Sequence, residues 1–281
     1  MKILSPLRYP GGKGQMYDEI EYIIRANRLS DKIYVEPFAG GFALGLSLLK
    51  NGIVAKTIIN DVDFHIFAFW KVVFNAPEKL ISKIIKTEIN IEEWKRQKSI
   101  YKKCDKRSLV NIAFSTLFLN RTNFSGVIKG GPIGGINQKG KYKLGCRFDK
   151  ERIVKQISEI SKFKDCVEIY NLDAKCLIKE VLSEKQKNLF INFDPPYVKK
   201  GKSLYTNFYK EEDHIELEKY ISEYLSCDWI MTYDDDPLIH KIYQKNLFFR
   251  FDIGYSANNH KNGTELFISQ RNYAHNIKFS A

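Results

Sequence analysis

Two consecutive prolines between an aspartate and a tyrosine form the segment of this 281-residue chain best suited to chemistry. The segment is Asp194, Pro195, Pro196 and Tyr197, and it directly follows the apolar stretch 189–193. Proline has no backbone N–H, so this turn offers acceptors and no donors at two positions. The Asp194 carboxylate and the Pro195 carbonyl can therefore each accept one hydrogen from an amino group. We take these four residues as the candidate catalytic set.

An acceptor pair of this kind suits group transfer to an aromatic amine, whose lone pair is delocalised into its ring. Two acceptors that draw the amino group out of the ring plane return lone-pair density to nitrogen and aim it at a methyl sulfonium carbon. Tyr197 would offer a face for a planar base, a contact worth about 1–3 kcal/mol. A base paired inside a duplex must flip out to reach such a pocket. The alternative, a stiff surface turn, is less favoured because the segment follows a buried strand.

A glycine-containing turn after an earlier strand, 33–38, is the second candidate site. The turn consists of Phe38, Ala39, Gly40 and Gly41, and Asp61 directly follows the next strand, 55–60. Glycine lets the backbone approach a ligand, and an acid at the end of the second strand accepts hydrogen bonds from ribose hydroxyls. The pattern predicts a nucleotide-type cofactor but does not separate nicotinamide dinucleotides from S-adenosylmethionine.

Strands and helices that could position these residues alternate along two parts of the chain. We expect core strands at 33–38, 55–60, 166–170, 189–193 and 229–233, a closing pair at 248–254 and 265–269 joined by a loop at 258–263, and helices at 42–49, 174–184, 211–225 and 236–244. This order predicts an α/β fold, a Rossmann-like doubly wound seven-stranded sheet with a C-terminal antiparallel hairpin.

Helical periodicity without a credible core strand interrupts this alternation between residue 64 and about residue 162. The expected helices are 71–86, 92–103 and 108–119, and a stretch rich in glycine and lysine follows at 122–147. We therefore predict a catalytic domain made of 1–63 and 163–281, with 64–162 as an inserted helical lobe.

The charge of the chain favours a polyanionic partner, because 45 lysines and arginines face 33 acids and give a net charge of +12. Charge alone leaves basic membrane surfaces and ordinary enzymes open. The stretch 122–147 carries Lys129, Lys139, Lys141 and Arg147, and Lys199 follows the proline turn. We expect a loop that contacts DNA and orders on binding; a solvated charge run is the alternative.

Several other classes of protein are disfavoured by the sequence. The five cysteines show no spacing typical of metal ligands or of a disulfide framework, so we expect no metal. Leu7 and Gly14 stand where a phosphate-binding P-loop needs glycine and serine or threonine. No Pro-Cys dipeptide occurs, which leaves methylation at cytosine carbon 5 unsupported. Without a signal peptide or an apolar span, the expected location is the cytoplasm.

In motif order and over almost its whole length, the chain resembles the Dam-type family of DNA adenine-N6 methyltransferases. The matching segments are residues 8–13 (Arg-Tyr-Pro-Gly-Gly-Lys), 36–41, 60–61, 119–126 (Leu-Asn-Arg-Thr-Asn-Phe-Ser-Gly), 194–197 and 262–266. Two segments depart from the family pattern: Phe42 replaces a small residue, and 129–135 differs from members that read GATC, so the recognised sequence cannot be transferred.

The resemblance implies S-adenosylmethionine as methyl donor, double-stranded DNA as substrate and a flipped adenine as target. Tyr9 and Lys13 would contact the cofactor, Lys13 near its methionine carboxylate; Asp61 would bind the ribose, Asp173 would approach the cofactor adenine, and Asp194 would touch cofactor and base. The lobe 64–162 would recognise the target, with Arg121 and Asn123 added to the DNA-binding residues above. The enzyme would be a monomer, acting alone or with a restriction endonuclease of the same site.

Three rival functions remain at this point. Another amino-group methyltransferase could act on cytosine N4, on structured RNA or on glutamine, although aspartate rather than serine or asparagine at position 194 favours adenine. A nicotinamide-dependent oxidoreductase would leave 194–197 and the basic lobe without a role. A DNA-binding protein without catalysis predicts that Asp194→Ala changes nothing.

Overall fold

The computed structural model describes residues 5–8, 13–198, 209–254 and 262–273. The chain forms two compact units, which we describe separately: a helical unit of Met1–Gly12 with Phe64–Asp165, and a sheet unit of Lys13–Asp63 with Cys166–Ala281. The division drawn from the sequence differs from these units at 1–12 and at 163–165. The functional labels of the two parts remain predictions.

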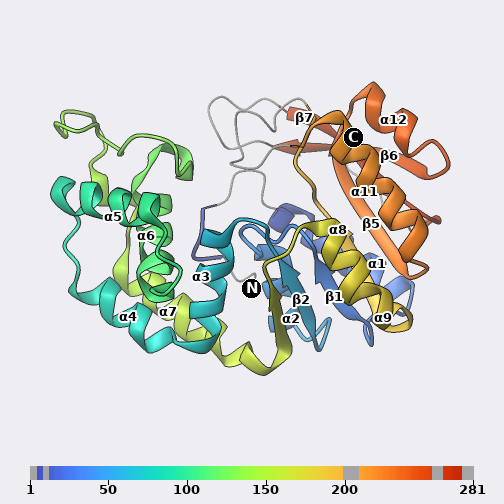
Figure 1. Ribbon diagram of the computed structural model, residues 1–281, viewed down its shortest axis with the longest axis horizontal. Helices are drawn as coiled ribbons and strands as arrows, with labels where there is room; N and C mark the ends of the chain where they lie inside the picture. The colour runs from blue at the N-terminus through green and yellow to red at the C-terminus, as the bar shows by residue number, and fades with distance from the viewer. Residues whose placement is uncertain (1–4, 9–12, 199–208, 255–261, 274–281) are drawn as a thin grey trace. The chain divides into compact units, whose positions relative to one another are not determined.

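The sheet unit contains seven strands in the order β3-β2-β1-β4-β5-β7-β6 (Figure 1). The strands are β1 Ile33–Glu36, β2 Thr57–Asn60, β3 Val167–Tyr170, β4 Leu189–Phe193, β5 Asp228–Asp234, β6 Leu247–Gly254 and β7 Asn262–Ser269. The first five pair in parallel, and β7 runs antiparallel to both β5 and β6. This arrangement confirms the predicted doubly wound sheet with a closing hairpin. The part of the predicted loop at 258–261 lies outside the described residues.

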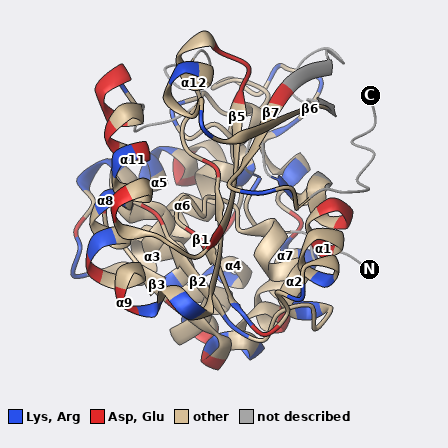
Figure 2. Cartoon of the chain, turned by 90° about the vertical axis from the view of Figure 1, so that its right-hand side faces the viewer, with Lys and Arg blue, Asp and Glu red and all other residues tan. Residues whose placement is uncertain are grey.

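Helices cover both faces of this sheet. They are η1 Lys13–Met16, α1 Tyr17–Ala26, α2 Ala43–Lys50, α8 Ala174–Leu177, α9 Ser183–Lys185, α11 Glu211–Tyr224 and α12 Pro237–Ile242, with short turns η5 Ile178–Leu182 and η6 Gln186–Asn188. Figure 2 shows α8, α9 and α11 on one side and α1 and α2 on the other. The strand order changes direction between β1 and β4, which is where open α/β sheets bind ligands.

The central strands are buried because both of their faces are covered, as expected of parallel strands rich in apolar residues. Every residue of β2 and of β4 is buried. Local signals fix some helix starts: Asp236 accepts a hydrogen bond from the Leu238 N–H at 3.0 Å and Pro237 begins α12. The predicted helix 174–184 is instead three short segments, because η5 is a single π turn.

Phe42 occupies the position where a small residue was expected, and its surroundings accommodate the ring. Its backbone is left-handed, with φ of 47°, and its side chain is 1% exposed. The ring lies over Gly45, where an added Cβ would stand 2.1 Å from Cε2 of Phe42. Phenylalanine at 42 therefore requires glycine at 45, one turn into α2.

We expect Gly45→Ala to destabilise the protein by about 1–3 kcal/mol, because overpacking a filled core forces backbone shifts. Urea unfolding of the single variants Gly45→Ala and Phe42→Ala and of the double variant measures the effect. The double variant should be about as stable as Phe42→Ala alone. Additive losses would show that the ring and the new methyl group do not collide.

The helical unit is built from five helices in its described part. They are α3 Phe64–Asn75, α4 Pro77–Lys86, α5 Ile91–Lys103, α6 Leu109–Thr122 and α7 Lys150–Ile160, with short turns η2 Phe124–Gly126, η3 Leu144–Arg147 and η4 Ser161–Cys166. The predicted single helix 71–86 is wrong: Pro77 lacks the N–H of a helix interior and begins α4 instead. Helix α7 was not predicted, although Ile153, Ile157 and Ile160 follow helical spacing and are buried.

Helix α6 is the centre of this unit, with ten buried residues and packing against α3 and α5. After it the chain continues to α7 with one isolated bridge between Asn123 and Pro132 and no longer strand in the described part. No helix among the described residues has the length and apolar character needed to cross a membrane.

Candidate active site

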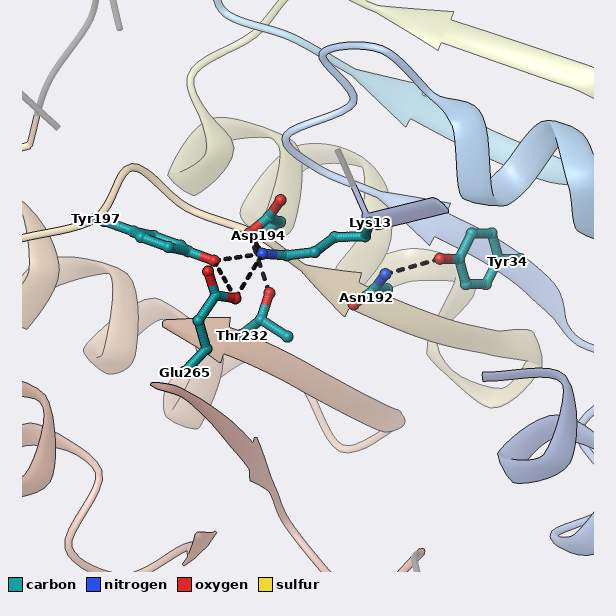
Figure 3. Close-up of polar contacts among 7 residues, drawn as sticks. All are labelled: Lys13, Tyr34, Asn192, Asp194, Tyr197, Thr232 and Glu265. Carbon is teal, nitrogen blue, oxygen red and sulfur yellow. Dashed lines mark hydrogen bonds and ion pairs between the residues drawn. The ribbon is translucent and has the colours of Figure 1, made fainter. Parts of the chain in front are cut away.

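Asp194 directly follows β4, at the carboxyl edge where the order of strands reverses. Its Oδ1 accepts a hydrogen bond from Thr232 Oγ1 at 3.0 Å and lies 3.2 Å from Lys13 Nζ. Figure 3 shows Oδ2 pointing away from both partners. Burial raises the pKa of Asp194, the Lys13 charge lowers it, and the Glu265 charge raises it. One carboxylate oxygen is thus fixed, and the other is presented as an acceptor.

Lys13 is the buried cation of this cluster, with 7% of its side chain exposed. Its ammonium lies 3.0 Å from Glu265 Oε2 and also donates to the Tyr197 hydroxyl. Burial lowers the pKa of Lys13, but the carboxylates of Asp194 and Glu265 raise it to a net value above its ordinary one. Lys13 therefore remains charged at neutral pH and compensates the buried Glu265 and the partly buried Asp194.

The proline turn itself is stiff and largely enclosed. Pro195 is buried, Pro196 is half-buried and the Tyr197 side chain is 5% exposed. The Tyr197 hydroxyl donates to Glu265 Oε2 at 2.6 Å. After the turn, the Val198 N–H donates to Asp234 Oδ1 at 3.0 Å. Both ends of the turn are therefore anchored; stacking of a base on the Tyr197 ring stays a prediction.

A second buried polar group lies on the N-terminal side of the turn. Asn192 Nδ2 donates to the Tyr34 hydroxyl at 2.8 Å (Figure 3), and Glu36 Oε1 accepts from the Gly45 N–H at 2.9 Å. Burial raises the pKa of Glu36 to about 8, so this carboxyl is protonated at neutral pH. The group joins β1, β4 and the start of α2 without adding a charge beside Asp194.

Asn60 holds together the loops that leave the carboxyl ends of β1 and β3. Its Nδ2 donates to the Pro37 carbonyl at 2.9 Å and to the Leu172 carbonyl at 3.0 Å, and its Oδ1 accepts from the Leu172 N–H at 2.9 Å. A buried amide with three such bonds acts as a rigid connector. Asn60 therefore fixes the loops on either side of Asp61.

Asp61 and the glycine turn meet, as the spacing predicts. Asp61 Oδ2 accepts from the Gly40 N–H at 2.9 Å, and its Oδ1 accepts from the Asp63 N–H at 2.9 Å. Gly40 has φ of 44°, in the left-handed region that glycine adopts without strain. Burial, and after it the charge of the nearby Asp63, raise the pKa of Asp61 to about 7. Each carboxylate oxygen retains a lone pair for a ligand hydroxyl.

The remaining residues of the predicted cofactor site lie around this edge of the sheet unit. Phe38 is half-buried, and its ring lies edge-on to Tyr209 with centroids 6.0 Å apart, a partner that the sequence did not indicate. Ala39 is 6% exposed. Asp173 caps α8 by accepting from the Lys175 N–H at 2.9 Å. Tyr9 lies outside the described residues.

The predicted DNA-binding residues of the helical unit divide into two groups. Four of them are exposed: Lys129, Lys139, Lys141 and Arg147. Arg121 is half-buried and donates through Nε to the Pro6 carbonyl at 2.7 Å; burial, together with the charges of Arg8 and Arg152, lowers its pKa to about 10. Lys199 lies outside the described residues.

Asn123 was predicted to contact DNA, but its side chain has a structural role inside the protein. Its side chain is fully buried; Oδ1 accepts from Trp94 Nε1 at 2.7 Å, and Nδ2 donates to the carbonyls of Val127, Ile128 and Gly130. All of its polar groups are thus used within the protein. Asn123 shapes the turn after α6.

The structure brings Lys13, Asp194 and Tyr197 together, and it adds two residues to which sequence reasoning gave no role. Thr232 comes from the buried strand β5, and Glu265 is a 1% exposed acid on β7 beside the apolar Leu266. The available signals for Glu265 were its place in the matching segment 262–266 and its position directly before the apolar run 266–268.

The chain is similar to known methyltransferases along most of its length. Residues 9–258 match the family model described as D12 class N6 adenine-specific DNA methyltransferase. The type II methyltransferase M.MjaIII of Methanocaldococcus jannaschii is 29% identical over 242 residues, which cover 78% of this chain and 80% of that protein. The type II methyltransferase M1.LlaDCHI of Lactococcus lactis subsp. cremoris is 27% identical over 220 residues, covering 75% and 73%.

A solved structure, the rRNA methyltransferase aviRa from Streptomyces viridochromogenes, shares 11% identity with a TM-score of 0.40, covering 94% of this chain and 88% of that chain. This likeness is too weak to bear on the reaction. The family match, in contrast, spans most of the chain and includes the segment from the glycine turn through Asp194. The chain belongs to the D12 class of N6 adenine-specific DNA methyltransferases.

Proposed function

We propose that this enzyme transfers the methyl group of S-adenosylmethionine to N6 of an adenine flipped out of double-stranded DNA, with Asp194 and the Pro195 carbonyl gripping the amino group. The proposal rests on how the two carboxylate oxygens of Asp194 are placed. Oδ1 is held by Thr232 and Lys13, while Oδ2 points away from them, at the switch point of the sheet. A fixed carboxylate with a presented oxygen suits an amine that must be oriented before it reacts.

The residues at the carboxyl ends of β1 and β2 are suited to binding the cofactor. Asp61 retains acceptor capacity for ribose hydroxyls, and Gly40 brings the backbone close with a positive φ. Asp173 and Phe38 would approach the adenine ring of the cofactor, and Lys13 and Tyr9 its methionine end. When bound, the cofactor would supply a methyl group attached to a sulfonium sulfur. The transfer is favourable because this sulfur leaves as a neutral thioether.

This chain's own residues orient the target and receive its proton. Asp194 Oδ2 and the Pro195 carbonyl accept the two amino hydrogens, which localises the lone pair on nitrogen. Once nitrogen gains the methyl group it must lose one proton, and Asp194 Oδ2 is the acceptor that we assign to it. Pro195 and Pro196 exclude competing backbone donors from the same edge.

We assign target recognition to 64–162 and catalysis to 1–63 with 163–281. The exposed Lys129, Lys139, Lys141 and Arg147 supply the charge that a DNA backbone requires, and Lys199 joins them by prediction. In place of a direct contact, we give Asn123 the role of shaping the recognition loop. Arg121 would contribute its guanidinium at the base of that loop.

Two curated relatives carry the name type II methyltransferase, a name that supports a place for this enzyme in restriction-modification. We infer a partner endonuclease that acts on the same DNA site and is blocked by the methyl group. The enzyme itself would act as a monomer, because a single active centre modifies one strand at a time.

Binding of S-adenosylmethionine is expected to strengthen with rising pH between about 6 and 8, because ribose hydroxyls bind the ionised form of Asp61, whose pKa is about 7. For one group of that pKa, the Kd at pH 6 should be about tenfold higher than at pH 8. Titration calorimetry measures the Kd, and Asp61→Asn is the matched control that should flatten the profile. A tenfold change retained by Asp61→Asn would assign the pH dependence to another group.

The proposed reaction is tested with methyl-labelled S-adenosylmethionine, purified protein and duplex DNA, followed by digestion to nucleosides. We expect the label in N6-methyl-2′-deoxyadenosine alone. Label in N4-methyl-2′-deoxycytidine, or transfer to RNA or protein with none to DNA, would contradict the assignment. Catalytically silent DNA binding would likewise contradict it.

A further inference from the structure

Glu265 lies at the centre of the active site, although none of the sequence motifs gave it a role. Its side chain is 1% exposed, and in the antiparallel register it lies opposite Asp234 of β5. Its Oε2 accepts from Lys13 Nζ at 3.0 Å and from the Tyr197 hydroxyl at 2.6 Å (Figure 3). Burying a carboxylate is costly without such partners. Packing alone therefore does not explain a glutamate at position 265, because an apolar residue would fill the same space at lower cost.

Lys13 is shared between two acids, and this sharing sets the charge on Asp194. The ammonium lies 3.2 Å from Asp194 Oδ1 and 3.0 Å from Glu265 Oε2. Paired with Asp194 alone, it would neutralise the carboxylate that must attract amino hydrogens. With Glu265 present, two negative charges face one positive charge, and a net negative charge remains on the cluster.

Glu265 also fixes the far end of the proline turn. The Tyr197 hydroxyl donates to Glu265 and accepts from Lys13, and the Lys13 ammonium lies 4.9 Å from the centroid of the Tyr197 ring. These contacts set the ring rotation of Tyr197. Glu265 thus holds the turn at both ends, at Tyr197 directly and at Asp194 through Lys13.

We propose that Glu265 is a positioning residue of the methyl-transfer site: it anchors Lys13 and Tyr197 so that the Asp194 carboxylate keeps its full strength as acceptor for the target amino group. The inference rests on the proposed function and extends it to a residue that acts through its neighbours. It predicts that the charge of Glu265, as well as its shape, matters for the reaction.

The test is the dependence of the single-turnover rate on pH, between about pH 5 and 9, for Glu265→Gln. Asp194 is faced by Lys13 of η1, Thr232 and Tyr233 of β5, Glu265 of β7, and Tyr34 and Glu36 of β1. Loss of the Glu265 charge leaves Lys13 to Asp194 alone, so the rate should fall about tenfold and its acid limb should move about one pH unit lower. Lys13→Met should move the limb in the opposite direction.

A double variant keeps the inference testable if Glu265→Gln does not fold. Lys13→Met with Glu265→Gln removes one charge of each sign and leaves no additional uncompensated charge. Its acid limb should lie below that of Lys13→Met. Glu168→Gln, on the exposed end of an ion pair with Lys185, is the control that should match the unmutated enzyme.

The outcomes separate this inference from the proposed function. A lower rate with an unmoved acid limb in folded Glu265→Gln, or a limb shifted upward, overturns the role of Glu265. If Glu265→Gln behaves as the unmutated enzyme while Asp194→Ala is inactive, only that role fails. If Asp194→Ala keeps full activity, the proposed function fails first.

Discussion

Replacing Asp194 by alanine should lower the single-turnover rate of methyl transfer on the order of 10²–10³-fold, the usual effect of removing one preorganised polar contact to a reacting centre. Oδ2 supplies that contact, and no neighbouring proline N–H can substitute for it. Asp194→Asn replaces one acceptor oxygen by a donor, so it should lose comparable activity. Quenched-flow assays with labelled cofactor measure the rate, and calorimetry of cofactor binding confirms that each variant is folded.

Thr232→Val is the matched control for this prediction. It removes the hydrogen bond to Asp194 Oδ1 and keeps the carboxylate, so its loss should be smaller than that of Asp194→Ala. An Asp194→Ala variant as active as the unmutated enzyme would exclude the acceptor role. A Thr232→Val variant as inactive as Asp194→Ala would assign the loss to the fold of the turn.

Replacing Lys13 by methionine should destabilise the protein by about 3–5 kcal/mol at neutral pH, because it leaves the buried Glu265 and the partly buried Asp194 without their shared cation. Lys185→Met breaks an ion pair whose members are both more than a third exposed and should cost under about 1 kcal/mol. Urea unfolding at fixed pH measures both variants.

The loss of stability in Lys13→Met should also depend on pH, and its direction follows from the pKa of Asp194. Burial already raises the pKa of Asp194, and removal of the ammonium raises it further. A carboxyl with a raised pKa binds its proton more tightly in the folded state, so stability falls as pH rises above the ordinary value of about 4. The deficit relative to the unmutated protein should therefore be smaller at about pH 5 than at pH 8. An equal deficit at both values would place the loss in packing rather than in charge.

The sheet could be predicted because its signals are local. Each central strand is a short apolar run. The runs that precede the glycine turn, Asp61 and Asp194 are each followed directly by a proline or an aspartate, which are uncommon inside strands. The errors in the predicted secondary structure concern helices, both their bounds and their number. Pro77 marked the start of α4 rather than the interior of a longer helix, and α1 was missed although Ile20, Ile23 and Ile24 have helical spacing.

The candidate site could be predicted only as far as contiguous motifs reach. The Asp61 contact to Gly40 follows from the geometry of one βαβ unit. The partners of Glu265 are separated from it by 252 residues for Lys13 and by 68 for Tyr197, and they meet only because β7 enters the sheet between β5 and β6. Asn123 shows the opposite limit, since an asparagine beside basic residues does not reveal whether its amide faces DNA or the protein.

The most direct test is modification-sensitive sequencing of DNA from a methylation-free host that expresses either the unmutated chain or Asp194→Ala. The unmutated chain should leave N6-methyladenine at one recurring sequence, and the variant should leave none at that sequence. A folded, cofactor-binding enzyme that leaves adenine unmodified, or a variant that modifies the same sites as fully, would contradict the role assigned to Asp194.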